Sequence, residues 1–396
     1  MKYPISYFKS DLPAGLIVFL VALPLCLGIA LASGAPLLSA IVSGIIGGIV
    51  VGIFSQSHVS VSGPAAGLTA IVLAAISSLG SFELFLTAVV LAGLFQLILG
   101  LIRAGNISHY FPSSVIEGML TGIGIIIILK QIPHATGLKM HPGAIIISIT
   151  SLLILIAFKQ ISCLNKNKYL PAELIVVLVS ITMNQYFIIS NSILKIENNL
   201  LVQLPVIEHP EAIFSQLHYP DFSGLNNYQV WIIALTITIV ASIESLFCLE
   251  ASEKMDPLKR YASSNRELIA QGAGNLLSGF LGGLPMSSVI VRTSANVSSG
   301  AKTKLATIMH GIFLLLSLIF FSSQINQIPL ASLAAILIMI GFKLSNPVVF
   351  IQMWRNGKNQ FIPFIITLIG VVFTDLLTGV MMGMIVSVLF RKHLNV

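Results

Sequence analysis

The chain has 396 residues, of which 56% are hydrophobic and 9% charged, and its mean hydropathy is +0.97. Soluble domains carry about 25% charged residues, so this composition excludes a soluble protein and indicates a membrane protein with many spans. The net charge of +7 would favour nucleic-acid binding only if the basic residues formed a patch, and their distribution along the chain excludes that.

Apolar segments of roughly 16 to 22 residues recur along the whole chain, and a helix needs about 20 residues to cross a bilayer core of about 30 Å. We therefore predict fourteen transmembrane segments, at about residues 13–32, 36–54, 60–79, 82–102, 113–129, 143–159, 170–189, 229–249, 264–281, 286–299, 303–321, 328–344, 360–374 and 376–390. A polar stretch at 190–228 is too short for a soluble domain and predicts an extracytoplasmic connection.

The basic residues predict the orientation of these segments. Of 21 Lys and Arg, 17 fall on one side of the membrane when the segments alternate, and three fall on the other, namely Lys130, Lys139 and Lys195. Arg292 lies within a segment. Because cytoplasmic loops carry an excess of Lys and Arg, we expect both termini in the cytoplasm.

Fourteen segments divide into two halves of seven, residues 1–189 and 229–396. Since seven is odd, the second half enters the membrane with the opposite orientation, which is the plan of an inverted repeat in many transporters. The third segment of each half should then be equivalent, and both are short and interrupted.

The third segment reads "HVSVSGPAAGLTAIVLAAISS" (58–78). Polar and apolar residues alternate from His58 to Ser62, which predicts a short strand. Gly63 and Pro64 then break the pattern, and Pro64 suits the first position of a helix that runs to about Ser78.

The tenth segment repeats this order, with extended chain from Leu284 to Val289 and a helix from about Ile290 to Ser299. Ten residues of helix span about 15 Å, so Arg292 is expected near the membrane midplane if Lys302 marks the cytoplasmic surface.

Two half-helices whose N-termini face each other at this depth would form an anion site. Helix N-termini carry unpaired N–H groups and about half a positive charge. Small residues after Gly63 allow close approach to the backbone, serine hydroxyls add donors and Arg292 adds a full charge. The predicted substrate-binding residues are Gly63, Pro64, Ala65, Ala66, Gly67, Ser287, Ser288, Val289 and Arg292. The alternative for Arg292 is a structural pairing with a buried carboxylate.

The carboxylate best placed for such pairing is Glu244 in "WIIALTITIVASIESLFCLE" (231–250). An ionisable residue inside a membrane segment is a functional candidate by default, so Glu244 is predicted to handle a coupling ion or proton, with a structural ion pair as the alternative. Cys248 lies four residues later, on the same helix face. Its thiol is a poor ligand for a hard cation such as Na⁺.

The remaining features are read as structural. Ser264 and Glu267 match a capping box that opens the ninth segment. The cysteines show no metal-ligand spacing and are expected to be buried thiols: Cys26, Cys163 and Cys248. With no metal cluster and no nucleophile–base pair in the segments, the sequence predicts neither an enzyme nor a resident metal or cofactor, apart from Na⁺ as a coupling ion.

The chain resembles the SulP family of inorganic anion transporters over essentially its whole length. The resemblance rests on four stretches: "DLPAGLIVFLVALP" (11–24), "SVSGPAAGLTAIV" (60–72), "SNRELIAQGAGN" (264–275) and "RTSANVSSGAKTK" (292–304). It implies an all-α membrane fold of fourteen segments in a 7+7 inverted repeat, with core and gate domains, often a dimer. It also implies an anion site between segments 3 and 10, with segments 1 and 8 beside it.

The chain departs from the sulfate-type members of this family. Leu25 follows the Pro24 of segment 1 where many members have glutamine, and Ile290-Val291 precedes Arg292 where many have Phe-Ser. Members usually carry a C-terminal STAS domain; this sequence stops at Val396, just after segment 14, so we expect that domain to be either absent or removed. The pattern "GGLPMSSVIVRTSAN" is more similar to members found beside carbonic anhydrases, which implies bicarbonate and a functional link to such an enzyme.

These observations predict a secondary transporter of a small inorganic anion, bicarbonate in the first place, in the inner membrane. Coupling to Na⁺, coupling to H⁺ and anion exchange all stay open. In bicarbonate members that use Na⁺, the positions of Glu244 and Cys248 hold Asp and Thr, so the carboxylate is retained and the hydroxyl is not. The alternatives are a sulfate transporter, including a proton symporter, and an uncoupled channel-like anion conductor.

Overall fold

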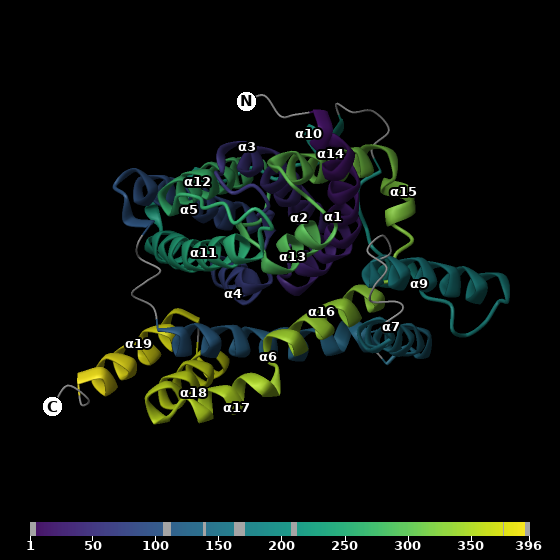
Figure 1. Cartoon of the computed structure of the whole chain (residues 1–396). Coiled ribbons are helices and arrows are strands. Elements are labelled where there is room, and N and C mark those ends of the chain that lie inside the picture. The colour runs from purple at the N-terminus through teal and green to yellow at the C-terminus, as the bar shows by residue number, and fades with distance from the viewer. Residues whose placement is uncertain are drawn as a thin grey trace.

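The computed structural model describes residues 5–105, 112–137, 140–161, 171–206, 212–374 and 376–392. Cys163 and Lys139 lie outside these ranges. Within them the chain forms a larger and a smaller helical body that lie side by side (Figure 1).

The larger body, which we call the core, contains both interrupted segments (Figure 1). Its elements are α1 (Ile5–Ala32), α2 (Leu37–Ile46), a π-helical turn (Gly47–Val51), α3 (Gly52–Phe54), β1 (Ser62–Pro64), a 3₁₀ turn (Ala66–Leu68), α4 (Thr69–Leu79), α5 (Phe82–Leu101), α11 (Tyr228–Met255), α12 (Ser264–Phe280), β2 (Met286–Ser288), α13 (Ile290–Ser298) and α14 (Lys304–Phe320).

The smaller body, the gate, lies along the side of the core that carries α4 (Figure 1). It is formed by α6 (Ser113–Thr136), α7 (Pro142–Gln160), α9 (Ala172–Ile189), α16 (Leu330–Leu344), α17 (Pro347–Arg355), α18 (Lys358–Phe373) and α19 (Leu376–Lys392). Short elements connect the bodies: α10 (Ala212–Ser215), α15 (Ser322–Ile325) and the 3₁₀ turns Asn198–Leu200 and Phe222–Asn226.

Each predicted segment has a counterpart in this order. Eight helices of the described part are long and apolar enough to cross a membrane, and four shorter apolar helices accompany them. Segments 3 and 10 each consist of a short strand followed by a half-helix, as predicted, and the half-helix of segment 3 is one of the four shorter helices. Helix α17 was not predicted. Asn346 caps it by accepting a hydrogen bond from Val348 N, and Pro347 occupies its first position.

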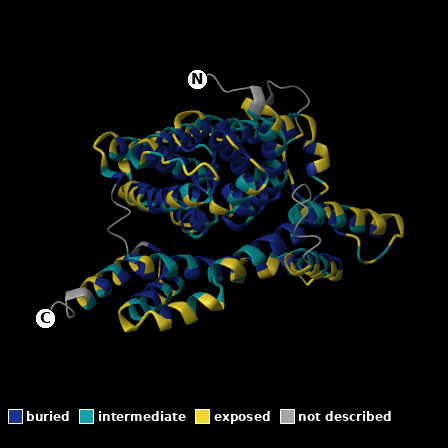
Figure 2. Ribbon diagram, viewed as in Figure 1, coloured by how far each residue is buried: buried dark blue, intermediate teal, exposed yellow. Residues whose placement is uncertain are grey.

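Burial differs between the two bodies (Figure 2). In α1 of the core, 72% of the most apolar stretch of the helix is buried inside the protein. The buried share of the corresponding stretch is 33% in α7 and 28% in α9 of the gate. Since these helices are long and apolar enough to cross a membrane, we expect their exposed apolar faces to contact lipid. The core places its polar residues inside.

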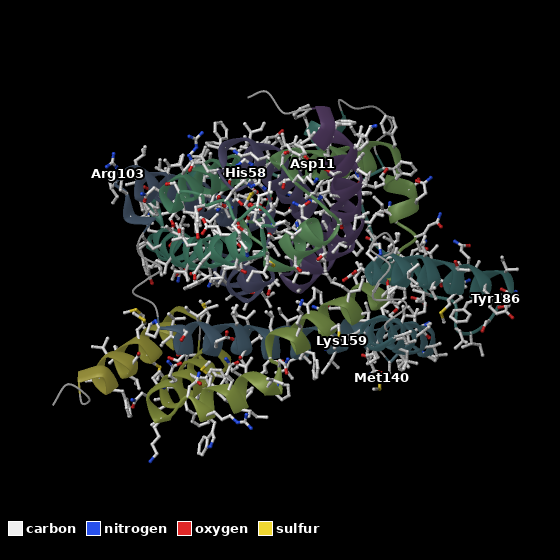
Figure 3. All side chains as sticks on the ribbon, in the orientation of Figure 1. Asp11, His58, Arg103, Met140, Lys159 and Tyr186 are labelled. Carbon is white, nitrogen blue, oxygen red and sulfur yellow. The ribbon has the colours of Figure 1, made fainter. Side chains whose placement is uncertain are left out.

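Asp11 ties the start of α1 to the start of α14. Its carboxylate accepts hydrogen bonds from Lys302 N at 2.7 Å, from Thr303 N at 3.2 Å and from the Thr303 hydroxyl. A carboxylate at a helix N-terminus satisfies unpaired N–H groups and complements the helix dipole. Figure 3 labels Asp11 where α1 and α14 lie together. The "DLP" motif therefore has a structural role.

The loop after α11 is held by a second buried carboxylate. Arg260 donates to Asp256 through Nε at 2.7 Å and Nη2 at 3.1 Å, and Leu258 N donates at 3.0 Å. Burial raises the pKa of Asp256, but the hydrogen bonds from Arg260 and Leu258 outweigh it and hold the pKa below its usual range. The connection between α11 and α12 is thus fixed.

The two interrupted segments meet in a two-stranded antiparallel ribbon. Strand β1 pairs with β2 so that Ser62 lies opposite Ser288, Gly63 opposite Ser287 and Pro64 opposite Met286. The predicted strand at residues 58–62 was therefore placed too early. Pro64 ends the strand instead of opening the helix, where its missing N–H breaks no further pairing, and the helix begins at Ala66 with a 3₁₀ turn.

Candidate functional site

The ribbon has two faces with different chemistry, because successive side chains of a strand point to opposite sides. Ser62 and Ser288 point toward α12, where Gln271 Nε2 donates to Ser62 Oγ at 2.7 Å and to Ser288 Oγ at 2.9 Å. Gly63 and Ser287 point the other way, toward Arg292 and Glu244. The predicted site residues are thus divided between the faces.

Arg292 is fully buried beside Gly63. Its Nη2 donates to Cys26 Sγ at 3.3 Å and to the Pro64 carbonyl at 3.4 Å, while Nε and Nη1 have no hydrogen-bond partner in the described part of the chain. A side chain at position 63 would overlap the guanidinium. Glycine is therefore required there so that the arginine can lie against the backbone.

Glu244 lies against the start of the first half-helix, at Gly67. A Cβ on Gly67 would lie 2.8 Å from Glu244 Oε1, so glycine is again what permits the approach. The Ser287 hydroxyl lies beside the Glu244 carboxylate and donates to the Ser288 carbonyl oxygen at 3.3 Å. Glu244 Oε2 is buried and has no partner among the described residues. We call Gly63, Gly67, Glu244, Ser287 and Arg292 the Arg292 site.

No ion pair joins Arg292 to a carboxylate among the described residues, whose ion pairs lie elsewhere. The structural alternative for Arg292, pairing with Glu244, therefore has no support in this conformation. Both side chains lie close to the same ribbon, and each keeps buried atoms without a partner among the described residues. Such atoms cost about 1–3 kcal/mol each, and more when charged, unless a ligand or water bonds them.

Both half-helices begin without a side-chain cap. Ala65 precedes the 3₁₀ turn and Val289 precedes α13 as N-cap residues, and neither side chain accepts a hydrogen bond from the first turn. Ala65 is buried and Ala66 half-buried. The backbone N–H groups of these first turns consequently lack intrahelical partners. The structure thus brings both N-termini to the ribbon as the sequence predicted.

Two predicted residues lie away from this face. The Ser288 hydroxyl belongs to the α12 side of the ribbon, where it donates to Glu267 Oε1 at 2.8 Å. Cys248 lies on the face of Glu244 but contacts Thr293, with 3.7 Å between Sγ and Oγ1. Cys248 and Cys26 are both buried free thiols, as predicted.

Sequence reasoning missed the cluster around Glu267. Its fully buried carboxylate accepts hydrogen bonds from Ser55 Oγ at 2.5 Å, Ser288 Oγ at 2.8 Å and Gln271 Nε2 at 2.8 Å. The predicted capping box was wrong by one residue: Ser263 is the N-cap and bonds Arg266 N. We call Glu267, Gln271, Ser55, Ser60, Ser62 and Ser288 the Glu267 cluster.

A signal for this cluster was present in "NRELIAQGAGN". Glu267, Gln271 and Asn275 are spaced by four, which places them on one helix face. Asn275 continues the row, since its side chain bonds Met286 N at 2.7 Å and Met286 O at 3.0 Å. Lys304 joins from α14 by donating to the Ser55 carbonyl. A polar stripe on an otherwise apolar helix indicates a buried network.

His310 was also missed. It lies on α14, is fully buried, and both of its ring nitrogens lack partners among the described residues. It is within electrostatic range of Arg292. A lone histidine in an apolar helix has no spacing pattern that would predict this neighbour. Among the described residues, no group of three His, Cys, Asp or Glu side chains could hold a metal ion.

Comparison with known proteins identifies the chain. The model of the sulfate permease family matches residues 8–146 and 139–367, which is most of the chain. The chain belongs to the sulfate permease family. It is an inorganic anion transporter of that family, which contains transporters and not enzymes.

Two curated relatives are similar at low identity. The putative sulfate transporter YvdB of Bacillus subtilis is 26% identical over 98% of this chain and 74% of its own length. The bicarbonate transporter BicA of Picosynechococcus sp. is 25% identical over 84% of this chain and 61% of its own length. The chain therefore spans about three fifths to three quarters of these relatives.

Two solved structures share the fold of this sulfate permease family member. The transmembrane domain of a cyanobacterial bicarbonate transporter BicA matches with a TM-score of 0.77 at 22% identity, over 98% of this chain and 99% of that chain. The murine solute carrier 26 family member A9 anion transporter, in its inward-facing state, matches with a TM-score of 0.80 at 18% identity, over 99% and 70%. The predicted all-α polytopic membrane fold is confirmed.

Proposed function

We propose that the protein is a secondary transporter of bicarbonate, with the anion bound at the Arg292 site. The observation that carries this proposal is the pair of unpartnered Arg292 nitrogens, Nε and Nη1, beside two uncapped half-helix starts. An anion bound there accepts hydrogen bonds from N–H donors that otherwise have no acceptor. Charge-assisted bonds of this kind contribute about 1.5–3 kcal/mol each.

Glu244 favours bicarbonate over sulfate. A carboxylate beside the site repels a dianion more strongly than a monoanion, because the Coulomb energy grows with the product of the charges. Bicarbonate also has one O–H group, which can donate to the unpartnered Glu244 Oε2 while its other oxygens accept from Arg292. Sulfate has no donor at neutral pH and leaves that oxygen unpaired.

Coupling is assigned to Glu244. A cation or proton bound at its carboxylate would neutralise the charge next to the anion, so the two ions would bind better together than apart. Glu244 and the Ser287 hydroxyl are oxygen ligands that suit Na⁺, whereas the Cys248 thiol suits it poorly and contacts Thr293 instead. The proposal includes coupling of anion transport to either Na⁺ or H⁺. Anion exchange is the variant of the same transport cycle in which no cation is carried.

Sulfate is the second candidate, favoured by the name of the relative YvdB. A proton on Glu244 would remove the repulsion described above, so a sulfate carrier at this site would be a proton symporter. Movement of the core against the gate around the site is the transport step proposed for either anion. Both termini are placed in the cytoplasm by the predicted distribution of Lys and Arg.

The test is uptake of labelled bicarbonate and labelled sulfate into proteoliposomes that contain the full chain, with Na⁺ and pH gradients imposed separately. We expect saturable bicarbonate uptake driven by one of the two gradients. If the protein is an exchanger, unlabelled bicarbonate inside the vesicles should drive the uptake. Uptake of sulfate but not of bicarbonate would show that the substrate is sulfate and contradict the proposed one. Weakly saturable currents that depend on no gradient of Na⁺ or H⁺ would indicate a channel-like conductor.

Glu244→Gln tests the coupling assignment in the same vesicles. The amide keeps the shape of the side chain but holds neither a proton nor a net charge, so we expect uptake that no longer responds to the driving gradient, while exchange persists. Cys248→Ser is the matched control on the same helix face and should retain the response. A Glu244→Gln protein with the wild-type gradient dependence would contradict the assignment.

A homodimer and a functional link to a carbonic anhydrase belong to the same proposal. They are supported by the resemblance to family members that form dimers or lie beside such enzymes. The enzyme would supply bicarbonate to, or remove it from, the cytoplasmic face, and co-expression should raise net bicarbonate uptake.

A further inference from the structure

A cavity of about 600 Å³ lies open to the surface between the core and the gate, and its lining contains no residue of the Arg292 site. Its walls come from α4 and α11 of the core and from α6, α18 and α19 of the gate. In Figure 1, α4 lies at the edge of the core that faces the gate. The lining is mostly apolar, with hydroxyl groups at Ser77, Ser78, Thr236 and Thr374.

The inner end of this cavity adjoins the proposed anion site. Ala70, the first α4 residue of the lining, comes three residues after Gly67, the glycine that packs against Glu244. From Ala70 to Ser78 at the other end, the helix rises about 12 Å. The cavity therefore runs along α4 from one turn beyond the site to the end of the helix.

Lys130 is the one charged side chain among the described residues of this lining. It is exposed, lies near the C-terminal end of α6, and makes no ion pair in the described part of the chain. The predicted orientation puts this end of α6, and the cavity mouth, on the extracytoplasmic side. An unpaired cation at an apolar opening creates a positive potential that low-dielectric walls focus inward.

We infer that Lys130 is the outer anion-attracting residue of the transporter, which concentrates a small inorganic anion at the mouth of the cavity before it reaches Arg292. This inference rests on the proposed function. In this inference Lys130 attracts the anion to the cavity mouth but does not contact the anion once it is bound at the Arg292 site. Removing the charge should therefore weaken uptake from outside at low anion concentration and leave the maximal rate intact.

The experiment compares Lys130→Gln with wild type in right-side-out and inside-out membrane vesicles, with labelled bicarbonate and labelled sulfate as probes. For the anion that wild type transports, we expect the KM of Lys130→Gln to rise about threefold to tenfold from the outer face. Vmax should stay within about twofold, and the KM from the cytoplasmic face should not change. Inert salt should raise the wild-type KM more than that of the variant.

Two further variants keep the test specific. Lys130→Arg retains the charge and should restore the wild-type KM, whereas Lys195→Gln removes an exposed lysine outside this lining and should have no effect. An unchanged KM in Lys130→Gln would mean that the lysine only reaches toward the membrane surface, and would overturn the inference. An equal rise from both faces, or in Lys195→Gln, would also overturn it. Absence of bicarbonate flux in wild type contradicts the proposed substrate, and sulfate kinetics then decide the role of Lys130.

Discussion

The two faces of the β1–β2 ribbon differ in how completely their buried polar atoms are bonded. On the α12 face, the Glu267 carboxylate has three donors, and Gln271 Oε1 is the one side-chain atom of the Glu267 cluster without a partner in the described residues. On the other face, Arg292 Nε, Arg292 Nη1 and Glu244 Oε2 all lack partners.

From this difference we expect the α12 face to contribute to stability and the other face to bind the anion. Buried polar groups in proteins are normally bonded, because an unpaired one costs free energy. A bonded cluster can hold the ribbon in one arrangement without any ligand. A cluster with open donors and an open acceptor is stabilised only when something binds to it, so variants on the two faces should fail in different measurements.

Arg292→Ala should give the largest effect. It removes the open donors, so we expect anion uptake to fall about 100-fold or more, since two charge-assisted bonds of about 1.5–3 kcal/mol each are lost. Because the arginine has no carboxylate partner, the thermal unfolding midpoint of the protein in detergent should hardly fall. Arg292→Lys keeps the charge and should retain part of the uptake. Wild-type uptake by Arg292→Ala would make the residue structural.

Glu267→Ala should lower the stability of the protein and leave anion binding unchanged. The substitution leaves donors from Ser55, Ser288 and Gln271 without an acceptor, which costs about 2–4 kcal/mol, so the unfolding midpoint should drop and less protein should be recovered. Glu267→Gln preserves an acceptor and should be milder. The KM of the folded fraction for the anion should stay near wild type. A variant with normal stability and a large change in KM would remove the distinction between the faces.

The sequence alone predicted most of the elements that build the site. Length and hydropathy located the segments, and the Gly-Pro break and the short run before Arg292 located the two half-helices. Charged residues inside apolar runs are conspicuous, so Arg292 and Glu244 were identified directly. Their unpartnered atoms could not be predicted, because hydrogen bonding depends on neighbours distant in the chain.

The register of the ribbon was beyond sequence reasoning for a physical reason. Its strands are more than 200 residues apart, and a shift of one residue moves every side chain to the opposite face. Ser287 and Ser288 therefore looked equivalent as donors, although the pairing sends them to different clusters. His310 was missed in the same way, since its charged neighbour Arg292 lies on α13 and no spacing in the sequence marks the two residues as neighbours.

That adjacent serine pair provides the finest test of the comparison. Ser287→Ala removes a hydroxyl from the Arg292 face of the ribbon, which we propose donates to the anion, so we expect the KM for the anion to rise about fivefold, the effect of one lost hydrogen bond of about 1 kcal/mol, with little loss of stability. Ser288→Ala removes a hydroxyl that bonds Glu267 at 2.8 Å, so the unfolding midpoint should fall while the KM stays unchanged. The two variants remove the same atom from neighbouring residues of one strand. If both shift the KM, or both shift only the midpoint, the faces of the ribbon do not divide binding from stability.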